Sequence, residues 1–312
     1  MQPLEKIRDA SYAVIDVRSP AEYAQGHVPR AENMSLFTNE ERAEVGTLYV
    51  QQSREQAMLR GLELVGPKLA GFVTQAQAIA QGRPAVLYCW RGGMRSASMA
   101  WLLRTAGLDV ETINGGYKAY RKRVHELLAL PWDLRVVAGY TGSGKTHYLQ
   151  SLASQGEQVL DLEALYRHKG STYGALGELP QPTTEHAMNL MADVLAGFDV
   201  QRPVWVEDES RKVGHVAIPD VFFERMQTST IVMLDVPRDV RVQNLVHDYG
   251  RYATQELVAA TERIRRRLGG EQCTAAVAAI EAGNLAAAAE IVLDYYDAAY
   301  DHYMKYRART RS

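Results

Sequence analysis

Gly139-Tyr140-Thr141-Gly142-Ser143-Gly144-Lys145-Thr146 is the stretch that decides the fold. It matches the pattern G-x-x-x-x-G-K-[ST] at every fixed position. The apolar run 134–138 before it is typical of a buried strand, and a helix-like run follows it. In that context the motif forms a loop whose backbone N–H groups surround phosphates. The alternative, a glycine-rich turn with a surface lysine, fits the flanking strand and helix poorly.

The loop predicts its own ligand contacts. Lys145 would pair with the terminal phosphate, and Thr146 would hold Mg²⁺ if a metal is used. The residues that we expect to bind the phosphates are Gly139, Thr141, Gly142, Ser143, Gly144, Lys145 and Thr146. Each backbone amide in such a loop offers one donor, so the signal depends on the glycines as much as on the lysine.

Acidic residues follow two further strand-like runs. Glu207, Asp208 and Glu209 come after 203–206, and one of them should lie near the metal. Asp161 ends the run 158–161, Glu163 comes shortly after it, and both could reach the same crevice. Arg211 is a further candidate phosphate contact, beside Lys212. The alternative for any one of these acids is a solvated loop charge.

Strand-like and helix-like runs alternate around the motif. The runs 134–138, 158–161, 203–207 and 230–235 are apolar, with helical stretches between them. This alternation predicts a doubly wound parallel sheet with its ligands at the carboxyl ends of the strands. From about Thr254 onward the Ala-, Arg- and Glu-rich chain predicts helices.

A second anion-binding loop precedes this region: Cys89-Trp90-Arg91-Gly92-Gly93-Met94-Arg95-Ser96. It also follows a strand-like run and opens a helix-like run. Its glycines allow successive N–H groups to point inward, and a helix N-terminus adds partial positive charge. With Arg91 and Arg95, these features favour a thiolate at Cys89. The alternative is a buried, inert cysteine at a strand end.

The first half of the chain predicts a small α/β domain. Strand-like runs at 13–17, 85–88 and 110–113 alternate with helical stretches at 38–82 and 96–106. Thr38 is a plausible helix cap. A basic helix over 117–130 would follow, so we expect domains at 1–125 and 126–312.

Composition bounds the class of protein. The chain has 312 residues, 46% of them hydrophobic, and this length favours two domains. No apolar run approaches the length of a membrane span, and no signal peptide is recognisable. Cys89 and Cys273 are its two cysteines, which indicates a reducing cytoplasm. Cys273 is expected to pack in a helix, and the scattered histidines predict no structural zinc site.

The N-terminal residues resemble a rhodanese domain. The stretches 16–20, 22–23 and 26–29 resemble its front, and 114–117 resembles its closing segment. Cys89 would then be the sulfur-carrying residue, Asp16 would order the neighbouring loops, and His27 would hold a turn. The spacing Cys-x5-Arg is that of the rhodanese-like phosphatases, whose longer loop fits a phosphate-sized group.

The whole chain resembles the bacterial tRNA 2-selenouridine synthase family, which joins a rhodanese-like domain to a P-loop domain. The resemblance extends from about residue 13 to about residue 245. The matching stretches are 16–20, 39–42, 45–47, 89–96, 115–118, 141–146, 168–171, 180–182 and 207–214. The pairing of the cysteine loop with this phosphate loop is the specific part.

This resemblance implies a two-step modification of the wobble 2-thiouridine of tRNA. Geranyl diphosphate would alkylate the sulfur, and selenophosphate would then supply selenium. The catalytic residues would be Cys89, Arg91, Arg95 and Lys145, with the diphosphate in the phosphate loop. Selenophosphate synthetase is a candidate partner, and no other protein partner or membrane is indicated.

Basic residues are candidates for binding the tRNA backbone. They are Lys118, Arg121, Lys122, Arg123, Arg263, Arg265, Arg266, Arg267, Arg307, Arg309 and Arg311. Tyr249 and Tyr252, which flank Arg251, could stack on anticodon bases. The alternative for each basic run is a solvated helix face.

Two other functions fit parts of the sequence. One is a Cys-x5-Arg phosphatase-like domain fused to a P-loop small-molecule kinase. The other is a nucleotide-switched scaffold with a degenerate rhodanese fold. The sequence leaves open which tRNAs are used, the carbon-5 substituent of the base, the use of ATP or GTP, the acid that accompanies Mg²⁺, and the number of subunits.

Overall fold

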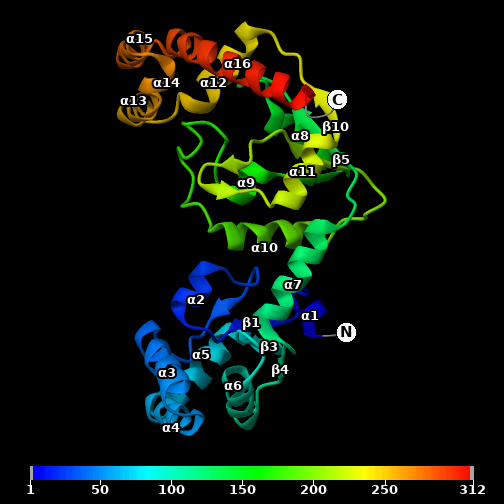
Figure 1. Ribbon diagram of the computed structural model, residues 1–312, viewed down its shortest axis with the longest axis vertical. Helices are drawn as coiled ribbons and strands as arrows, with labels where there is room; N and C mark the ends of the chain where they lie inside the picture. Colours follow the sequence, from blue (N-terminus) through cyan, green and yellow to red (C-terminus); the bar gives the residue numbers. More distant parts are fainter. Residues whose placement is uncertain (1–2, 310–312) are drawn as a thin grey trace. The chain divides into compact units, whose positions relative to one another are not determined.

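The structure, a computed structural model, describes residues 3–309 and divides into two compact units (Figure 1). The N-terminal unit contains Met1–Leu127 and Met188–Asp193. The C-terminal unit contains Leu128–Ala187 and Val194–Ser312. The short segment Met188–Asp193 belongs to the first unit although it comes late in the chain, and no feature of the sequence signals this placement.

A four-stranded parallel sheet forms the centre of the N-terminal unit, with strand order β2-β1-β3-β4. Its strands are β1 (Ala13–Asp16), β2 (Glu32–Asn33), β3 (Ala85–Tyr88) and β4 (Val110–Thr112). Strands β1 and β3 are buried along their whole length, which explains their continuous apolar sequence. The two-residue β2 has no apolar pattern and was not predicted.

Helices cover this sheet and complete its core. They are α1 (Pro3–Lys6), α2 (Pro20–Gln25), α3 (Asn39–Gln51), α4 (Arg54–Val65), α5 (Leu69–Ala80), α6 (Met94–Thr105) and α7 (Gly116–Ala129), with a 3-10 turn at Gly66–Lys68. Met99 and Leu103 of α6 pack with Ile15 and Leu87 of the sheet. The predicted cap of α3 is confirmed: the Thr38 hydroxyl accepts a hydrogen bond from the Glu41 N–H.

The C-terminal unit contains a second parallel sheet, with order β10-β5-β7-β6. Its strands are β5 (Leu134–Ala138), β6 (Gln158–Leu160), β7 (Val204–Glu207) and β10 (Thr230–Met233). All four strand predictions are confirmed. A small antiparallel hairpin of β8 (Lys212–Val213) and β9 (Val216–Ala217) was not predicted.

The predicted C-terminal helices form a cluster of their own, yellow to red in Figure 1. The helices of the second half are α8 (Lys145–Ser154), α9 (Leu162–Tyr166), α10 (Thr184–Leu195), α11 (Asp220–Thr228), α12 (Arg238–Tyr249), α13 (Thr254–Arg263), α14 (Arg265–Leu268), α15 (Gly270–Glu281) and α16 (Leu285–Arg309). Helix α16 packs on α12 and α15, and α15 packs on α13. Over residues 3–309, no helix combines the length and the apolar character that crossing a bilayer requires.

Candidate functional sites at two anion-binding loops

The cysteine loop joins the end of β3 to the start of α6. Cys89 directly follows the strand and is only 3% exposed. Its Sγ lies 3.2 Å from the Ser96 hydroxyl, in the first turn of α6. The thiol therefore faces a helix N-terminus, where partial positive charge stabilises an anion.

Opposing effects act on the pKa of Cys89. Burial alone raises it, because the charged form loses its hydration. Hydrogen bonds from the hydroxyl and N–H of Ser96, the charge of Arg95 and the N–H of Arg91 lower it, and their sum prevails. The net pKa is therefore lower than that of an ordinary thiol, which favours the nucleophilic thiolate.

The two arginines of the loop have different surroundings. Arg95 is largely buried, and its guanidinium lies 2.8 Å from the carboxylate of Glu22. Arg91 is exposed, and no residue in the described part of the chain forms a hydrogen bond or ion pair with its guanidinium. Arg95 is thus the arginine whose charge reaches Cys89, while Arg91 contributes through its backbone. The role of Glu22 was not foreseen.

The start of α7 closes the cysteine loop from behind. The N–H groups of Tyr117 and Lys118 donate to the carbonyls of Cys89 and Trp90, at 2.8 and 2.9 Å. Gly116 has φ +56°, and a Cβ there would lie 2.2 Å from the Cys89 carbonyl oxygen. Only glycine permits this close approach, which explains the Gly-Gly pair before Tyr117.

A buried ion pair orders the neighbouring loops, as expected for Asp16. Its carboxylate lies 2.6 Å from the guanidinium of Arg18, which also donates to the Gly26 carbonyl. The guanidinium carbon of Arg18 lies 3.8 Å from the centre of the Tyr117 ring. His27 stacks on Tyr23, and its Nδ1 lies 2.9 Å from the Tyr23 carbonyl oxygen. His27 therefore holds a turn in this unit, and burial lowers its pKa.

The phosphate loop leads from β5 into α8. The Lys145 ammonium donates to the Gly139 carbonyl at 3.0 Å, so it lies over the mouth of the loop. The Ser143 hydroxyl is buried and has no hydrogen-bond partner in the described chain. A buried donor without a partner is unfavourable. This hydroxyl is available to a phosphate oxygen.

Two glutamates, Glu163 and Glu209, interact with the lysine, and Glu207 lies near Glu163. The Thr146 hydroxyl donates to Glu163 at 3.1 Å, and Glu163 contacts Glu209. Burial raises the pKa of Glu163, Glu207 and Glu209. Repulsion from Asp161 and then Glu163 raises the pKa of Glu207 further, and repulsion from Glu163 does so for Glu209. Lys145 opposes the shift at Glu163 and Glu209. Of the candidate acids, Glu163 is the one that reaches Thr146.

The remaining predicted ligands have other partners. The Asp161 carboxylate accepts the Ala164 N–H at 2.8 Å and so caps α9. Arg211 is exposed and lies 2.5 Å from Asp220. For Mg²⁺, the hydroxyl of Thr146 and the carboxylate of Glu163 are hard oxygen donors that fit the ion. No group of three or more His, Cys, Asp or Glu residues among those described is placed to hold a metal.

Side chains from two distant helices support the phosphate loop. From α12, Arg241 donates to the Thr141 carbonyl at 3.2 Å, and Asn244 donates to the Gly142 carbonyl at 2.8 Å. From α16, the Tyr300 hydroxyl accepts the Gly139 N–H at 3.1 Å. These supporting residues were not predicted, because nothing in their local sequence marks them.

The prediction that Arg307 binds tRNA is wrong. Arg307 is 1% exposed and lies 2.6 Å from the buried carboxylate of Asp208. Because Arg307 is buried inside the C-terminal unit, the tRNA backbone cannot reach it. Its charge is already neutralised by Asp208. Asp208 also accepts a hydrogen bond from Tyr300, so it is part of the support for the loop. Arg311 and the side chain of Arg309 lie outside the part that the structure describes.

The other candidates for tRNA binding divide into two groups. The first group has its side chains engaged within the protein: Arg121 is hydrogen-bonded to Asn189 at 2.5 Å, and Tyr249 lies in the wall of an apolar cavity. The exposed group is Lys118, Lys122, Arg123, Arg263, Arg265, Arg266 and Arg267. This group remains a prediction for phosphate contacts.

Two family models match the chain. The Rhodanese-like domain matches residues 2–123, and the tRNA 2-selenouridine synthase AAA domain matches residues 132–311. Their order agrees with the two α/β units. The predicted fold class, a rhodanese-like domain followed by a P-loop domain with C-terminal helices, is therefore confirmed.

Several curated relatives share the name tRNA 2-selenouridine synthase. The relative from Bdellovibrio bacteriovorus is 40% identical over 79% of this chain and 66% of its own length. The relative from Nitrosomonas europaea is 40% identical over 77% of this chain and 64% of its own length. The chain thus spans slightly less than two thirds of the length of each of these two relatives. The relative from Psychromonas ingrahamii is 31% identical over 95% of this chain and 88% of its own. By these matches, the chain belongs to the tRNA 2-selenouridine synthase family.

Proposed function

We propose that this protein is a tRNA-modifying transferase that converts wobble 2-thiouridine to 2-selenouridine through S-geranyl-2-thiouridine. Its co-substrates would be geranyl diphosphate and selenophosphate. One observation carries the proposal: a cysteine with a lowered pKa and a complete phosphate loop lie on one chain. The name of the curated relatives supports the choice of substrate.

The first step would take place at the phosphate loop. The sulfur of 2-thiouridine attacks carbon 1 of the geranyl group, a carbon–sulfur bond forms, and the carbon–oxygen bond to diphosphate breaks. Lys145 would move from the Gly139 carbonyl to the departing diphosphate and stabilise its growing charge. The unpartnered hydroxyl of Ser143 would donate to the same anion.

The second step would take place at the cysteine loop. Overall, the geranylated base, selenophosphate and water give 2-selenouridine, geranyl thiol and phosphate. The thiolate of Cys89 would attack the donor at phosphorus: a sulfur–phosphorus bond forms, the phosphorus–selenium bond breaks, and selenide leaves. The selenide then adds to carbon 2 of the base and displaces geranyl thiolate, while water hydrolyses the phosphorylated Cys89 to the free thiol and phosphate. The N–H groups around Cys89 and the charge of Arg95 would hold the phosphate-sized part of the donor.

Mg²⁺ would be held by Thr146 and Glu163, and when bound it would neutralise charge on the diphosphate. The exposed basic residues, Lys118, Lys122 and Arg123 among them, would contact the tRNA backbone. We expect the enzyme to act in the cytoplasm and to receive its donor from selenophosphate synthetase.

Two substitutions test the proposal by separating its steps. Lys145→Ala should abolish geranylation of thiolated tRNA, and selenation of that tRNA should fail with it. Cys89→Ser should retain geranylation and lose selenation, so the geranylated nucleoside accumulates. Mass spectrometry of the wobble nucleoside measures both products. If both variants modify tRNA as the wild type does, the proposal fails.

The same variants test the two rival functions. The first rival is a phosphatase-like domain fused to a small-molecule kinase. Turnover of a generic aryl phosphate that is lost in Cys89→Ser would favour that rival. A scaffold would keep its function in Cys89→Ser, so loss of selenated tRNA in this variant rejects it.

A further inference from the structure

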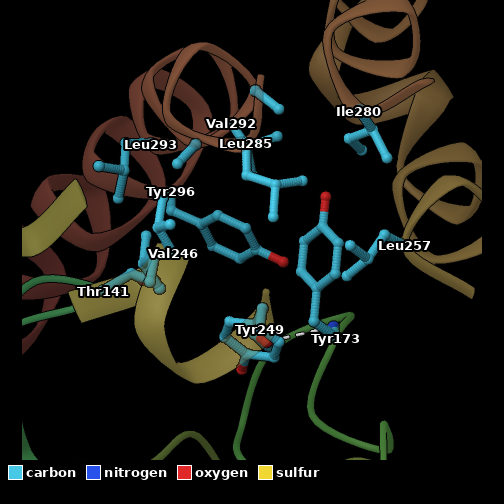
Figure 2. Close-up of a pocket in the computed structure, with 14 residues that line it drawn as sticks. Thr141, Tyr173, Val246, Tyr249, Leu257, Ile280, Leu285, Val292, Leu293 and Tyr296 are labelled. Carbon is cyan, nitrogen blue, oxygen red and sulfur yellow. Dashed lines mark hydrogen bonds between the residues drawn. The ribbon is translucent and has the colours of Figure 1, made fainter. Parts of the chain in front are cut away.

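An apolar cavity of about 70 Å³ lies within the C-terminal unit, between the helical cluster and the loop that carries Tyr173 (Figure 2). Figure 2 shows side chains from α12, α13, α15 and α16 pointing into one space. The lining residues on which the argument depends are Thr141, Leu245, Val246, Tyr249, Leu285 and Ala289. The proposed mechanism assigns no role to this space.

The tyrosine hydroxyls in the wall already have partners. The Tyr173 hydroxyl lies 2.7 Å from the Thr261 hydroxyl, and the Tyr296 hydroxyl accepts the Thr172 N–H at 3.1 Å. Burial raises the pKa of Tyr249 to about 12, so its hydroxyl is neutral at physiological pH. A buried water needs two to four polar partners, and a sugar or base needs several as well. The cavity therefore suits a hydrocarbon better than water or a nucleoside.

The cavity adjoins the phosphate loop through shared elements. Thr141 belongs to the loop and also lines the cavity. Helix α12 contacts the loop carbonyls with Arg241 and Asn244, and its next residues, Leu245 and Val246, line the cavity. A ligand whose diphosphate is bound in the loop would thus have an apolar wall beside it.

We infer that this cavity binds the isoprenoid chain of an allylic diphosphate whose head group occupies the phosphate loop. The inference rests on the proposed function, in which geranyl diphosphate is the alkyl donor, and it assigns the residues that recognise the chain. Each methylene buried from water increases affinity by about fourfold. The chain, rather than the diphosphate, would then distinguish this ligand from nucleotides and inorganic diphosphate.

Filling the cavity tests the inference. Ala289 is half-buried on α16 and lines the cavity, so Ala289→Phe would occupy the space of the chain. Calorimetric titration of the full chain should show at least about tenfold weaker binding of geranyl diphosphate and unchanged binding of inorganic diphosphate. Ala286→Phe is the matched control, because Ala286 is exposed on the same helix and does not line the cavity.

A second variant enlarges the cavity and does not depend on the folding of the first. Leu285→Ala removes a lining side chain, so the affinity for farnesyl diphosphate should rise relative to that for geranyl diphosphate. The inference would be overturned if the affinities for geranyl, farnesyl and inorganic diphosphate kept their wild-type ratios in both Ala289→Phe and Leu285→Ala. It would also be overturned if the wild-type protein bound geranyl diphosphate no more tightly than inorganic diphosphate.

These results are separable from the fate of the proposed function. If the cavity variants alter chain binding but wild-type protein does not geranylate tRNA, the inference stands and the proposed function fails. If tRNA is geranylated at wild-type rates by Ala289→Phe, and chain binding is unaltered in both variants, only the inference fails.

Discussion

The cysteine loop and the phosphate loop begin alike but are supported differently. Each follows a buried strand and opens a helix. The cysteine loop is closed by backbone N–H groups of Tyr117 and Lys118, which lie close in sequence. The phosphate loop is held by side chains of α12 and α16, at sequence separations of 100 for Arg241 and 161 for Tyr300.

This difference determines which changes each loop tolerates. Backbone atoms packed against the cysteine loop leave no room for an added side chain, so a single added methyl group should strongly destabilise this loop. A support made of distant side chains should weaken by steps as each contact is removed. Four substitutions examine this contrast, in decreasing order of expected effect.

Gly116→Ala should have the largest effect. Gly116 has φ +56°, and the added Cβ would lie 2.2 Å from the Cys89 carbonyl oxygen. We therefore expect the N-terminal unit to lose about 4 kcal/mol or more of stability. The control is Gly144→Ala in the phosphate loop, at φ +75°, where the nearest atoms lie 4.0 Å away. Its cost should be only about 1 kcal/mol. Urea denaturation measures both, and equal costs would contradict the contrast.

Arg307→Met should destabilise the C-terminal unit by about 3 kcal/mol, because it leaves the buried charge of Asp208 without its ion pair. The double variant Arg307→Met with Asp208→Asn should recover part of this loss, since no charge remains uncompensated. Denaturation midpoints of the single and double variants measure the difference. If the double variant is the less stable of the two, the explanation by an unpaired charge is wrong.

Tyr300→Phe should cost about 1 kcal/mol, because the Gly139 N–H loses its acceptor. The affinity for inorganic diphosphate should fall with it, while the alkylation rate of Cys89 stays constant. Tyr295→Phe, on the same helix, is the control, since no described hydrogen bond uses the Tyr295 hydroxyl. Equal losses of diphosphate affinity in the two variants would show that Tyr300 does not support the loop.

Ser96→Ala should have the smallest effect, confined to reactivity. Removing the hydroxyl removes one of the hydrogen bonds that lower the pKa of Cys89, so this pKa should rise. The thiolate fraction at neutral pH then falls, and the alkylation rate drops several-fold with its inflection at higher pH. Ser98→Ala is the control, because the Ser98 hydroxyl bonds to the Met94 carbonyl on the exposed side of α6. An unshifted inflection in Ser96→Ala would exclude Ser96 as a source of the lowered pKa.

Much of the fold was predictable because it follows from local sequence. The buried strands β3 and β5 and the loops after them are continuous stretches in which apolar runs and glycines suffice for recognition. The elements that were missed lack such patterns. Strand β2 has two residues, and the β8–β9 hairpin has two in each strand, too few to show a period.

The site was predictable where its parts are adjacent in sequence. Cys89 and Lys145 lie within motifs, but the apolar cavity is assembled from helices that touch only after folding. Arg307 looked like part of a basic, exposed tail, and only its partner Asp208, far earlier in the chain, reveals that it is buried. Long-range pairing of this kind has no signature in a single sequence.

The distant support of the phosphate loop has a consequence for synthesis on the ribosome, where N-terminal domains fold first. The contacts that close the cysteine loop are available once the start of α7 has emerged. The residues that hold the phosphate loop, Tyr300 among them, are translated long after the loop itself. A nascent chain can therefore carry a finished thiol site for some time before its phosphate loop is fully supported.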